Sequence, residues 1–251
     1  MPRRPLIAGN WKMHTSIAEA KELAQTIARA SADVSDRDVM IAPPFTHLAA
    51  VADVLAGSKV ILASQNICWE EKGAFTGEIS PVMLKEFGCS MALVGHSERR
   101  HVFGETDSII NKRITGALKF GITPILCVGE TIEEREGGKT FGVLETQTKK
   151  GLLNAEITNA DRIVVAYEPV WAIGTGKTAT VEQAQEAHAF LRKLLSELFE
   201  KNIASQIRIL YGGSVNPDNV DLLMNQEDID GALVGGAALK ADSFSRIIHF
   251  N

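Results

Sequence analysis

Eight short apolar segments recur along the chain and are separated by segments with helical character. They begin near Leu6, Val39, Val60, Met91, Ile122, Ile163, Ile207 and Gly231. Each is nearly continuous in apolar residues rather than alternating, which is typical of strands buried on both faces of a parallel sheet. Eight strand–helix units in 251 residues predict a closed (β/α)8 barrel. No linker rich in proline or serine interrupts the pattern, so we expect one domain over residues 1–251.

Helix-start signals precede several of the intervening segments. Capping boxes, in which a hydroxyl residue is followed by Glu or Gln three positions later, occur at Ser16–Glu19, Thr131–Glu134 and Thr180–Gln183. Ser80–Pro81 and Asn216–Pro217 place a good N-cap before a proline at the first helical position. A doubly wound open sheet is the structural alternative. It would need a GxGxxG turn after its first strand, and the segment Gly9–Lys12 is not one.

Net charge and cysteine content restrict the class of protein. The net charge is -5, so an anionic ligand must be held by a local site rather than by a global positive field. The three cysteines, Cys68, Cys89 and Cys127, form no CxxC pair, which disfavours a disulfide framework or a zinc site. No apolar stretch has the length of a signal peptide core or a membrane span. We therefore expect a cytoplasmic protein that binds neither nucleic acid nor membrane.

Residues 164–177 carry the strongest functional signal. The segment Val164–Tyr167 has the composition of a buried strand, Glu168 stands where that strand ends, and Pro169 prevents its regular continuation. An apolar tip over 170–173 and two glycines follow. We interpret Glu168 as a base and the segment behind it as a lid that shields it from water. A solvated Glu that begins an ordinary loop is the alternative, and the clustered apolar tip argues against it.

Two diglycine turns follow the last two predicted strands. Tyr211–Ser214 and Val234–Gly236 contain them, and glycine allows backbone N–H groups to approach an anion closely. Either turn alone would indicate only a tight turn. Loops after strands seven and eight form phosphate sites in this architecture, so the pair predicts one here. Lys12, at the mouth of the first strand, would add a full positive charge, although alone it would be an ordinary surface lysine.

His96 follows the fourth predicted strand, on the same rim as Glu168. That position favours an acid–base role for His96, whereas a structural role stays open for the other five histidines. We interpret Ser97 and Glu98 as residues that support His96 and Glu168 rather than react. A metal site is disfavoured because no second His or Cys lies at ligand spacing.

Five motifs together resemble the triosephosphate isomerase family. They are Gly9–Met13, Val94–Arg100, Ala166–Lys177, Tyr211–Ser214 and Val234–Gly236. They occur in the family's order over essentially the whole chain, and His14 differs from the asparagine that the family pattern has there. The resemblance implies a TIM barrel that interconverts dihydroxyacetone phosphate and D-glyceraldehyde 3-phosphate in glycolysis and gluconeogenesis, with no cofactor and no metal.

The resemblance also implies roles for individual residues. Glu168 is similar to the base that moves the proton, and neutral His96 resembles the electrophile that polarises the carbonyl. Lys12 resembles the cation that stabilises the enediolate and balances the phosphate charge, with Asn10 beside it as a donor. The implied substrate and phosphate contacts are Asn10, Lys12, Gly174, Ser214, Gly235 and Gly236.

The connection over residues 65–79 is long for a barrel loop and has no clear helical pattern. In the family that the chain resembles, such a loop inserts into a neighbouring subunit beside the first motif. The resemblance therefore implies a homodimer, with contacts at Thr76 and Glu78.

Two other classes of function stay open from the sequence. Another barrel enzyme acting on a phosphorylated substrate, such as a Schiff-base aldolase, would need a lysine at a mid-chain strand end, where this chain has Glu168. A catalytically silent phosphate-binding barrel is disfavoured because Asn10, Lys12, His96 and Glu168 are all present. An isomerase assay with each triose phosphate would separate the three.

Overall fold

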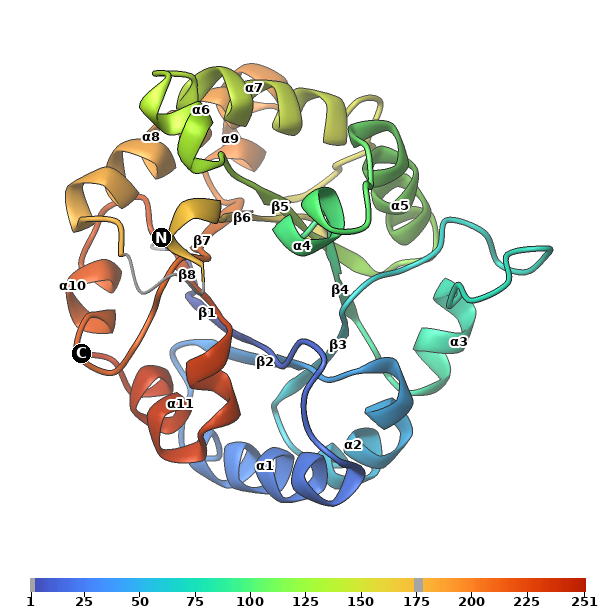
Figure 1. Ribbon diagram of the computed structural model, residues 1–251. Coiled ribbons are helices and arrows are strands. Elements are labelled where there is room, and N and C mark those ends of the chain that lie inside the picture. The colour runs from blue at the N-terminus through green and yellow to red at the C-terminus, as the bar shows by residue number, and fades with distance from the viewer. Residues whose placement is uncertain (1–2, 174–177) are drawn as a thin grey trace.

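In the computed structural model, eight parallel strands close into a barrel in chain order (Figure 1). The structure describes residues 3–173 and 178–251. The strands are β1 (Leu6–Asn10), β2 (Asp38–Ala42), β3 (Ile61–Ser64), β4 (Met91–Val94), β5 (Thr123–Val128), β6 (Val164–Tyr167), β7 (Arg208–Tyr211) and β8 (Gly231–Val234). The barrel closes between β1 and β8, where Leu6 pairs with Gly231. The predicted (β/α)8 fold is confirmed, and each predicted strand start lies within one residue of the observed one.

Helices surround the barrel on its outside (Figure 1). They are α1 (Ile17–Ala30), α2 (Leu48–Leu55), α3 (Pro81–Glu86), α4 (Ser97–His101), α5 (Asp107–Lys119), α6 (Ile132–Glu136), α7 (Thr140–Gly151), α8 (Val181–Leu198), α9 (Lys201–Ala204), α10 (Val220–Met224) and α11 (Ala241–Ile248). Short 3-10 turns are η1 (Phe45–His47), η2 (Ala160–Arg162), η3 (Val170–Ala172) and η4 (Gly236–Leu239). Helices between successive parallel strands are what a right-handed crossover requires.

The predicted helix starts are confirmed at four of five positions. Ser16, Thr131 and Thr180 each form a complete capping box, and Ser80 accepts a hydrogen bond from the Met83 N–H ahead of Pro81. The fifth is wrong, because α10 begins at Val220 and not at Pro217.

The segment after Asn216 forms a turn for a reason visible in its hydrogen bonds. Asn216 Oδ1 accepts from the Asn219 N–H at 3.1 Å, and Asn219 Oδ1 accepts from the Asn216 N–H at 2.9 Å. These reciprocal bonds have the pattern of a capping box, and the Val220 N–H donates to the Asn216 carbonyl at 3.2 Å, so Asn216 caps a turn that leads into α10. Asn219 Nδ2 also donates to the Ser214 carbonyl at 2.9 Å, so this turn positions the loop after β7.

The core has two layers, one inside the barrel and one between the barrel and its helices. Residues that fill the barrel interior include Leu6, Met40, Leu93, Ile125, Val164 and Leu210. Helix α8 buries the apolar stripe expected from the sequence, with Leu191 and Leu195 fully enclosed. No helix within residues 3–173 or 178–251 combines the length and apolar character that crossing a membrane requires.

Candidate active site

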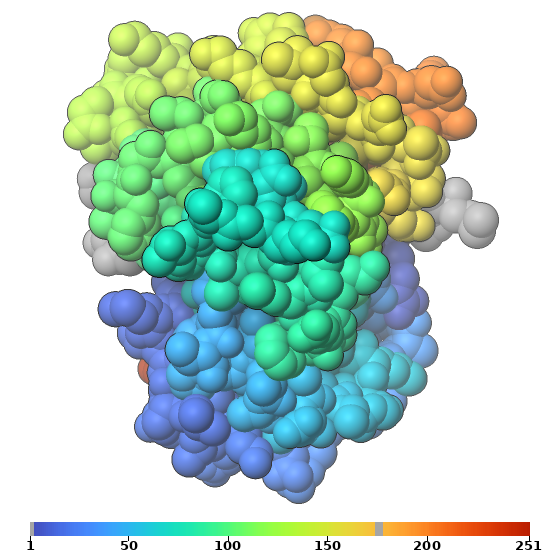
Figure 2. Space-filling view, turned by 90° about the vertical axis from the view of Figure 1, so that its right-hand side faces the viewer, coloured from blue at the N-terminus to red at the C-terminus, as the bar shows by residue number. Residues whose placement is uncertain are grey.

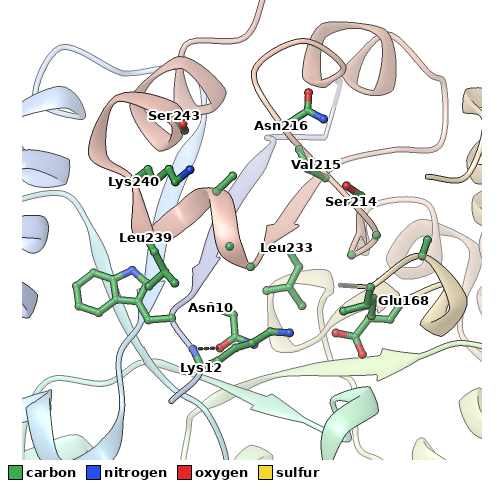
Figure 3. A pocket seen from close by; sticks show the side chains of 18 of the residues that line it. Asn10, Lys12, Glu168, Ser214, Val215, Asn216, Leu233, Leu239, Lys240 and Ser243 are labelled. Carbon is green, nitrogen blue, oxygen red and sulfur yellow. Dashed lines mark hydrogen bonds between the residues drawn. The ribbon is translucent and has the colours of Figure 1, made fainter. Parts of the chain in front are cut away.

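A cavity of about 550 Å3 opens at the C-terminal ends of the strands (Figure 3). Its lining includes the predicted residues Asn10, Lys12, His96, Glu168, Ser214, Gly235 and Gly236. They come from the end of β1 and from the segments after β1, β4, β6, β7 and β8, and the barrel topology brings them to one rim. Gly174, a predicted phosphate contact, lies outside the described residues.

Glu168 lies directly after β6 and its side chain is buried, with 2% exposed. Its Oε2 accepts a hydrogen bond from the Ser97 N–H at 2.8 Å, and its Oε1 lies 3.0 Å from His96 Nε2. The Glu168 N–H donates to the Val128 carbonyl at 2.7 Å, which continues the β5–β6 pairing beyond the last strand residue. The main chain of Glu168 is thus fixed by the end of β5, and its carboxylate contacts the Ser97 N–H and His96 Nε2.

Two glycines make room for Glu168. A Cβ on Gly129 would lie 1.7 Å from the Glu168 carbonyl oxygen, and a Cβ on Gly212 would lie 2.9 Å from Glu168 Cγ. Neither distance is compatible with a larger residue unless Glu168 moves. The ends of β5 and β7 therefore pack against this residue so closely that only glycine fits.

The hydrogen bonds of His96 define its tautomer. Nδ1 accepts from the Glu98 N–H at 3.2 Å, so the proton of a neutral ring must be on Nε2. Nε2 faces Glu168 and the cavity. His96 therefore presents an N–H donor to the place where a substrate oxygen would lie.

Lys12 extends across the cavity toward Glu168, as Figure 3 shows. Its N–H donates to Asn10 Oδ1 at 3.0 Å, and its φ of 51° turns the chain sharply after β1. Lys12 Nζ lies 2.7 Å from Glu98 Oε1. Burial raises the pKa of Glu98, but the hydrogen bond from Lys12 and the charges of His96 and Lys12 outweigh it and leave the pKa below its usual value.

The loops after β7 and β8 offer backbone donors to the cavity. Within the described residues, nothing accepts a hydrogen bond from the N–H of Ser214, Gly235 or Gly236. A Cβ on Gly236 would meet nothing within 4 Å in the part of the chain that the structure describes, so packing there does not require glycine. Free N–H groups facing an open space form an anion site.

A buried carboxylate after β5 contacts the start of the segment that follows Glu168. Glu130 is 0% exposed, and its Oε1 accepts from Tyr167 Oη at 3.1 Å, from Trp171 Nε1 at 3.0 Å and from Arg135 Nη1 at 3.1 Å. Arg135 also lies over the Trp171 ring at 4.7 Å. Glu130 thus anchors the start of the segment after Glu168, while residues 174–177 lie outside the described part of the chain.

The long loop over residues 65–79 is observed without helix, as predicted, and it protrudes from one side of the barrel (Figure 1). In Figure 2 the loop lies at the front of the molecule, on the face turned toward the viewer. Thr76 is exposed. Glu78 is bound within its own chain, because both of its carboxylate oxygens pair with Arg113, at 2.7 and 2.9 Å.

Comparison with known proteins agrees with this geometry. The family model described as triosephosphate isomerase matches residues 5–251. The chain belongs to the triosephosphate isomerase family. Proteins named triosephosphate isomerase from Syntrophotalea carbinolica and Geobacter metallireducens are each 55% identical to it, covering 99% of this chain and 98% and 99% of theirs. A protein of that name from Roseiflexus sp. (strain RS-1) is 53% identical, covering 99% of this chain and 98% of its own.

The family assignment makes the chain an isomerase that acts on triose phosphates, an activity that belongs to glycolysis. It also settles the two alternatives left open by the sequence. A Schiff-base aldolase would need a lysine at the end of β6, where the structure has Glu168. A silent barrel does not fit an isomerase family. Among the described residues, no group of three His, Cys, Asp or Glu side chains is arranged to hold a metal ion.

Proposed function

We propose that the chain interconverts dihydroxyacetone phosphate and D-glyceraldehyde 3-phosphate with Glu168 as the base. The contact between His96 Nε2 and Glu168 Oε1, at 3.0 Å, is the observation that carries this proposal. It places a base and a hydrogen-bond donor on one side of the cavity, close enough to act on adjacent atoms of one substrate.

In the proposed reaction, Glu168 takes a proton from the carbon next to the substrate carbonyl. The electrons of that C–H bond form the carbon–carbon double bond of an enediolate, and the carbonyl oxygen becomes negative. The His96 Nε2–H and the Lys12 ammonium stabilise that oxygen, and preorganised donors of this kind often supply the largest part of a rate enhancement. His96 moves a proton between the two oxygens, and Glu168 returns its proton to the neighbouring carbon.

The phosphate of the substrate is proposed to bind the N–H groups of Ser214, Gly235 and Gly236. None of these N–H groups has an acceptor in residues 3–173 or 178–251, which supports this assignment. A Cβ on Gly235 would lie 3.5 Å from Lys12 Cε, and the Lys12 side chain points toward Glu168 (Figure 3), so its charge acts on both the phosphate and the developing oxyanion. Asn10 holds Lys12 in place through the hydrogen bond to its N–H. Gly174 stays a proposed phosphate contact.

The proposal includes a homodimer formed through the loop over residues 65–79. Large apolar side chains lie exposed on two segments that contact the start of the loop: Met13 is 93% exposed, Val102 71% and Phe103 67%. Exposed apolar side chains in such number are typical of a surface that another subunit covers. Thr76 is the proposed contact at the exposed part of the loop. Glu78 is proposed to contribute by fixing the loop, since Arg113 already occupies its carboxylate.

A cytoplasmic location is also part of the proposal. It is supported by three cysteines that are buried and form no disulfide, Cys68, Cys89 and Cys127. Thiols of this kind are usual in reducing compartments.

A coupled assay with each triose phosphate tests the proposed function. Wild-type protein should convert both substrates, and Glu168→Gln and His96→Gln should each lower turnover by a factor on the order of a hundred or more. Wild-type protein that converts neither substrate would contradict the proposal. Variants that keep wild-type turnover would contradict the roles given to these two residues.

A further inference from the structure

Arg100 is a buried cation that has no part in the proposed reaction. It contacts the backbone of the segment that contains His96. Its side chain is 8% exposed, and it lies in α4, four residues after His96. Arg100 Nε donates to the Gly95 carbonyl at 2.8 Å, and Nη2 donates to the Cys127 carbonyl at 3.0 Å. Nη1 pairs with Asp107 Oδ1 at 2.7 Å.

Arg100 contacts the backbone on both sides of His96. Arg100 also donates its backbone N–H to the His96 carbonyl at 3.2 Å, so it binds the carbonyls on both sides of the His96 N–Cα–C unit. The peptide that follows His96 carries the Ser97 N–H, which donates to Glu168. Gly95 has a φ of 74°, and a Cβ there would lie 3.2 Å from Arg100 Nη2, so glycine fits both the turn and the guanidinium.

Arg100 also links β4 to the strand that positions Glu168. Cys127 lies in β5, and the next residue, Val128, accepts the Glu168 N–H. The end of β5 therefore holds Glu168 through one carbonyl and Arg100 through the adjacent one. A planar guanidinium has donors at fixed angles, so it can set the spacing of two carbonyls in a way that a lysine ammonium cannot.

We infer that Arg100 is a positioning residue, which sets the His96 ring and the Ser97 N–H relative to Glu168 by clamping the ends of β4 and β5. This inference rests on the proposed roles of His96 and Glu168. Asp107 balances the charge of Arg100, so the pair is neutral overall. The positive charge that acts in the cavity is therefore that of Lys12.

The matched control is Arg192, which makes the same kind of clamp at the other end of the barrel. Its side chain is 13% exposed, and it donates to the Ile207 carbonyl and pairs with Asp230, at the points where β7 and β8 begin. Substituting either arginine by lysine removes a buried guanidinium fork. Only the change at Arg100 alters the geometry of the proposed catalytic groups.

The test compares Arg100→Lys and Arg192→Lys by steady-state kinetics and thermal unfolding. Arg100→Lys should lower kcat by about tenfold to a hundredfold with KM changed by no more than about threefold, since misplacement by about 1 Å can cost a hundredfold in rate. Both variants should lower the Tm to a similar extent. Arg192→Lys should leave kcat within about twofold of wild type. If Arg100→Lys does not fold, Arg100→Gln, which retains one donor group, serves with the same expected split.

Two results would overturn the inference. One is a folded Arg100 variant with wild-type kcat; the other is an equal loss of kcat in the Arg100 and Arg192 variants, which would indicate a general effect on stability. His96→Gln and Glu168→Gln separate this from failure of the proposed function. If those two variants lose activity and the Arg100 variants do not, only the positioning role is wrong.

Discussion

Lys12 Nζ and Glu98 Oε1 lie 2.7 Å apart, so the cation that we assign to the substrate is paired before any substrate arrives. The Glu98 side chain is 46% exposed, and pairs exposed to this degree contribute only about 0.2–1 kcal/mol. A substrate phosphate and a developing oxyanion carry more charge than one carboxylate. Lys12 can therefore exchange Glu98 for the substrate at small cost.

Lys12→Met should lower kcat/KM by a factor on the order of a thousand, because it removes both phosphate attraction and oxyanion stabilisation. The fold should persist, since Lys12 is a rim residue that supports little of the core. The measurement is activity together with the far-UV circular dichroism spectrum. Lys149→Met, which removes an exposed lysine paired with Glu145 on α7, is the control and should leave activity unchanged. A folded Lys12→Met enzyme with substantial activity would count against the role of Lys12.

Gly212 and Gly236 should respond differently to the same added methyl group. A Cβ at Gly212 would press on Glu168 Cγ at 2.9 Å, whereas a Cβ at Gly236, which lines the cavity, would meet no atom of the described residues within 4 Å. Gly212→Ala should therefore lower kcat by about tenfold to a hundredfold. Gly236→Ala should mainly raise KM and weaken inhibition by inorganic phosphate. The same pattern of kcat and KM in both variants would contradict the separate roles of the two turns.

His188 should make the protein lose stability in acid. It is fully buried against Tyr167 and Tyr211, Nδ1 lies 3.2 Å from the Asp228 carbonyl, and Nε2 has no partner among the described residues. Burial lowers the pKa of His188 from 6.5 to about 3. Between these values the unfolded chain binds a proton that the folded chain does not, so stability falls as the pH decreases from 6.5 toward 3, by up to about 5 kcal/mol.

The variant His188→Asn isolates this effect, because the amide can still donate to the Asp228 carbonyl but does not titrate. Urea unfolding at pH 8 and pH 5, at one protein concentration, gives the comparison. The variant should be less stable by about 2 kcal/mol at pH 8 and should lose less stability than wild type on going to pH 5. Equal losses in the two proteins would assign the acid sensitivity to other groups.

Arg113 should control the proposed dimer through the loop over residues 65–79. It is 3% exposed, pairs with Glu78 through both carboxylate oxygens, and lies 3.0 Å from Glu105 Oε1. Arg113→Met would leave Glu78 without its cation and Glu105 with Arg99 alone, and breaking a buried pair costs about 3–5 kcal/mol. Sedimentation velocity over a dilution series should show the monomer at a protein concentration about a hundredfold higher than for wild type.

Arg162→Met is the control for that experiment, because the hydrogen bond of Arg162 among the described residues goes to the Leu118 carbonyl and not to residues 65–79. Its dissociation should match wild type. A dimer equally stable in both variants would mean that the conformation of this loop does not depend on Arg113.

The sequence predicts the barrel well because its signals are local. Continuous apolar runs mark strands buried on both faces, and a capping box such as Thr180–Gln183 lies within one helical turn. The error at Asn216–Pro217 is also local in origin. Asn216 makes the expected N-cap bond to the Asn219 N–H, but the chain forms a turn over residues 217–219 before regular helix begins at Val220, so the error concerns the helix boundary.

The chemistry-bearing residues are predicted because five motifs resemble one family, while their supports are not. Arg100 meets Cys127, and Glu130 meets Trp171, over separations that no pattern of neighbouring residues encodes. The pairing of Glu78 with Arg113 cannot be read from the sequence for the same reason. These contacts follow from the closure of the barrel, which brings the ends of distant strands within reach of one another.

The central claim, that Glu168 is the base, is tested most directly by the turnover of Glu168→Asp. The shorter side chain keeps the carboxylate but withdraws it by one methylene from the position set by Gly212 and Ser97. We predict a kcat lower by a factor on the order of a hundred, with phosphate inhibition unchanged within about threefold. A kcat within a few-fold of wild type would contradict the account.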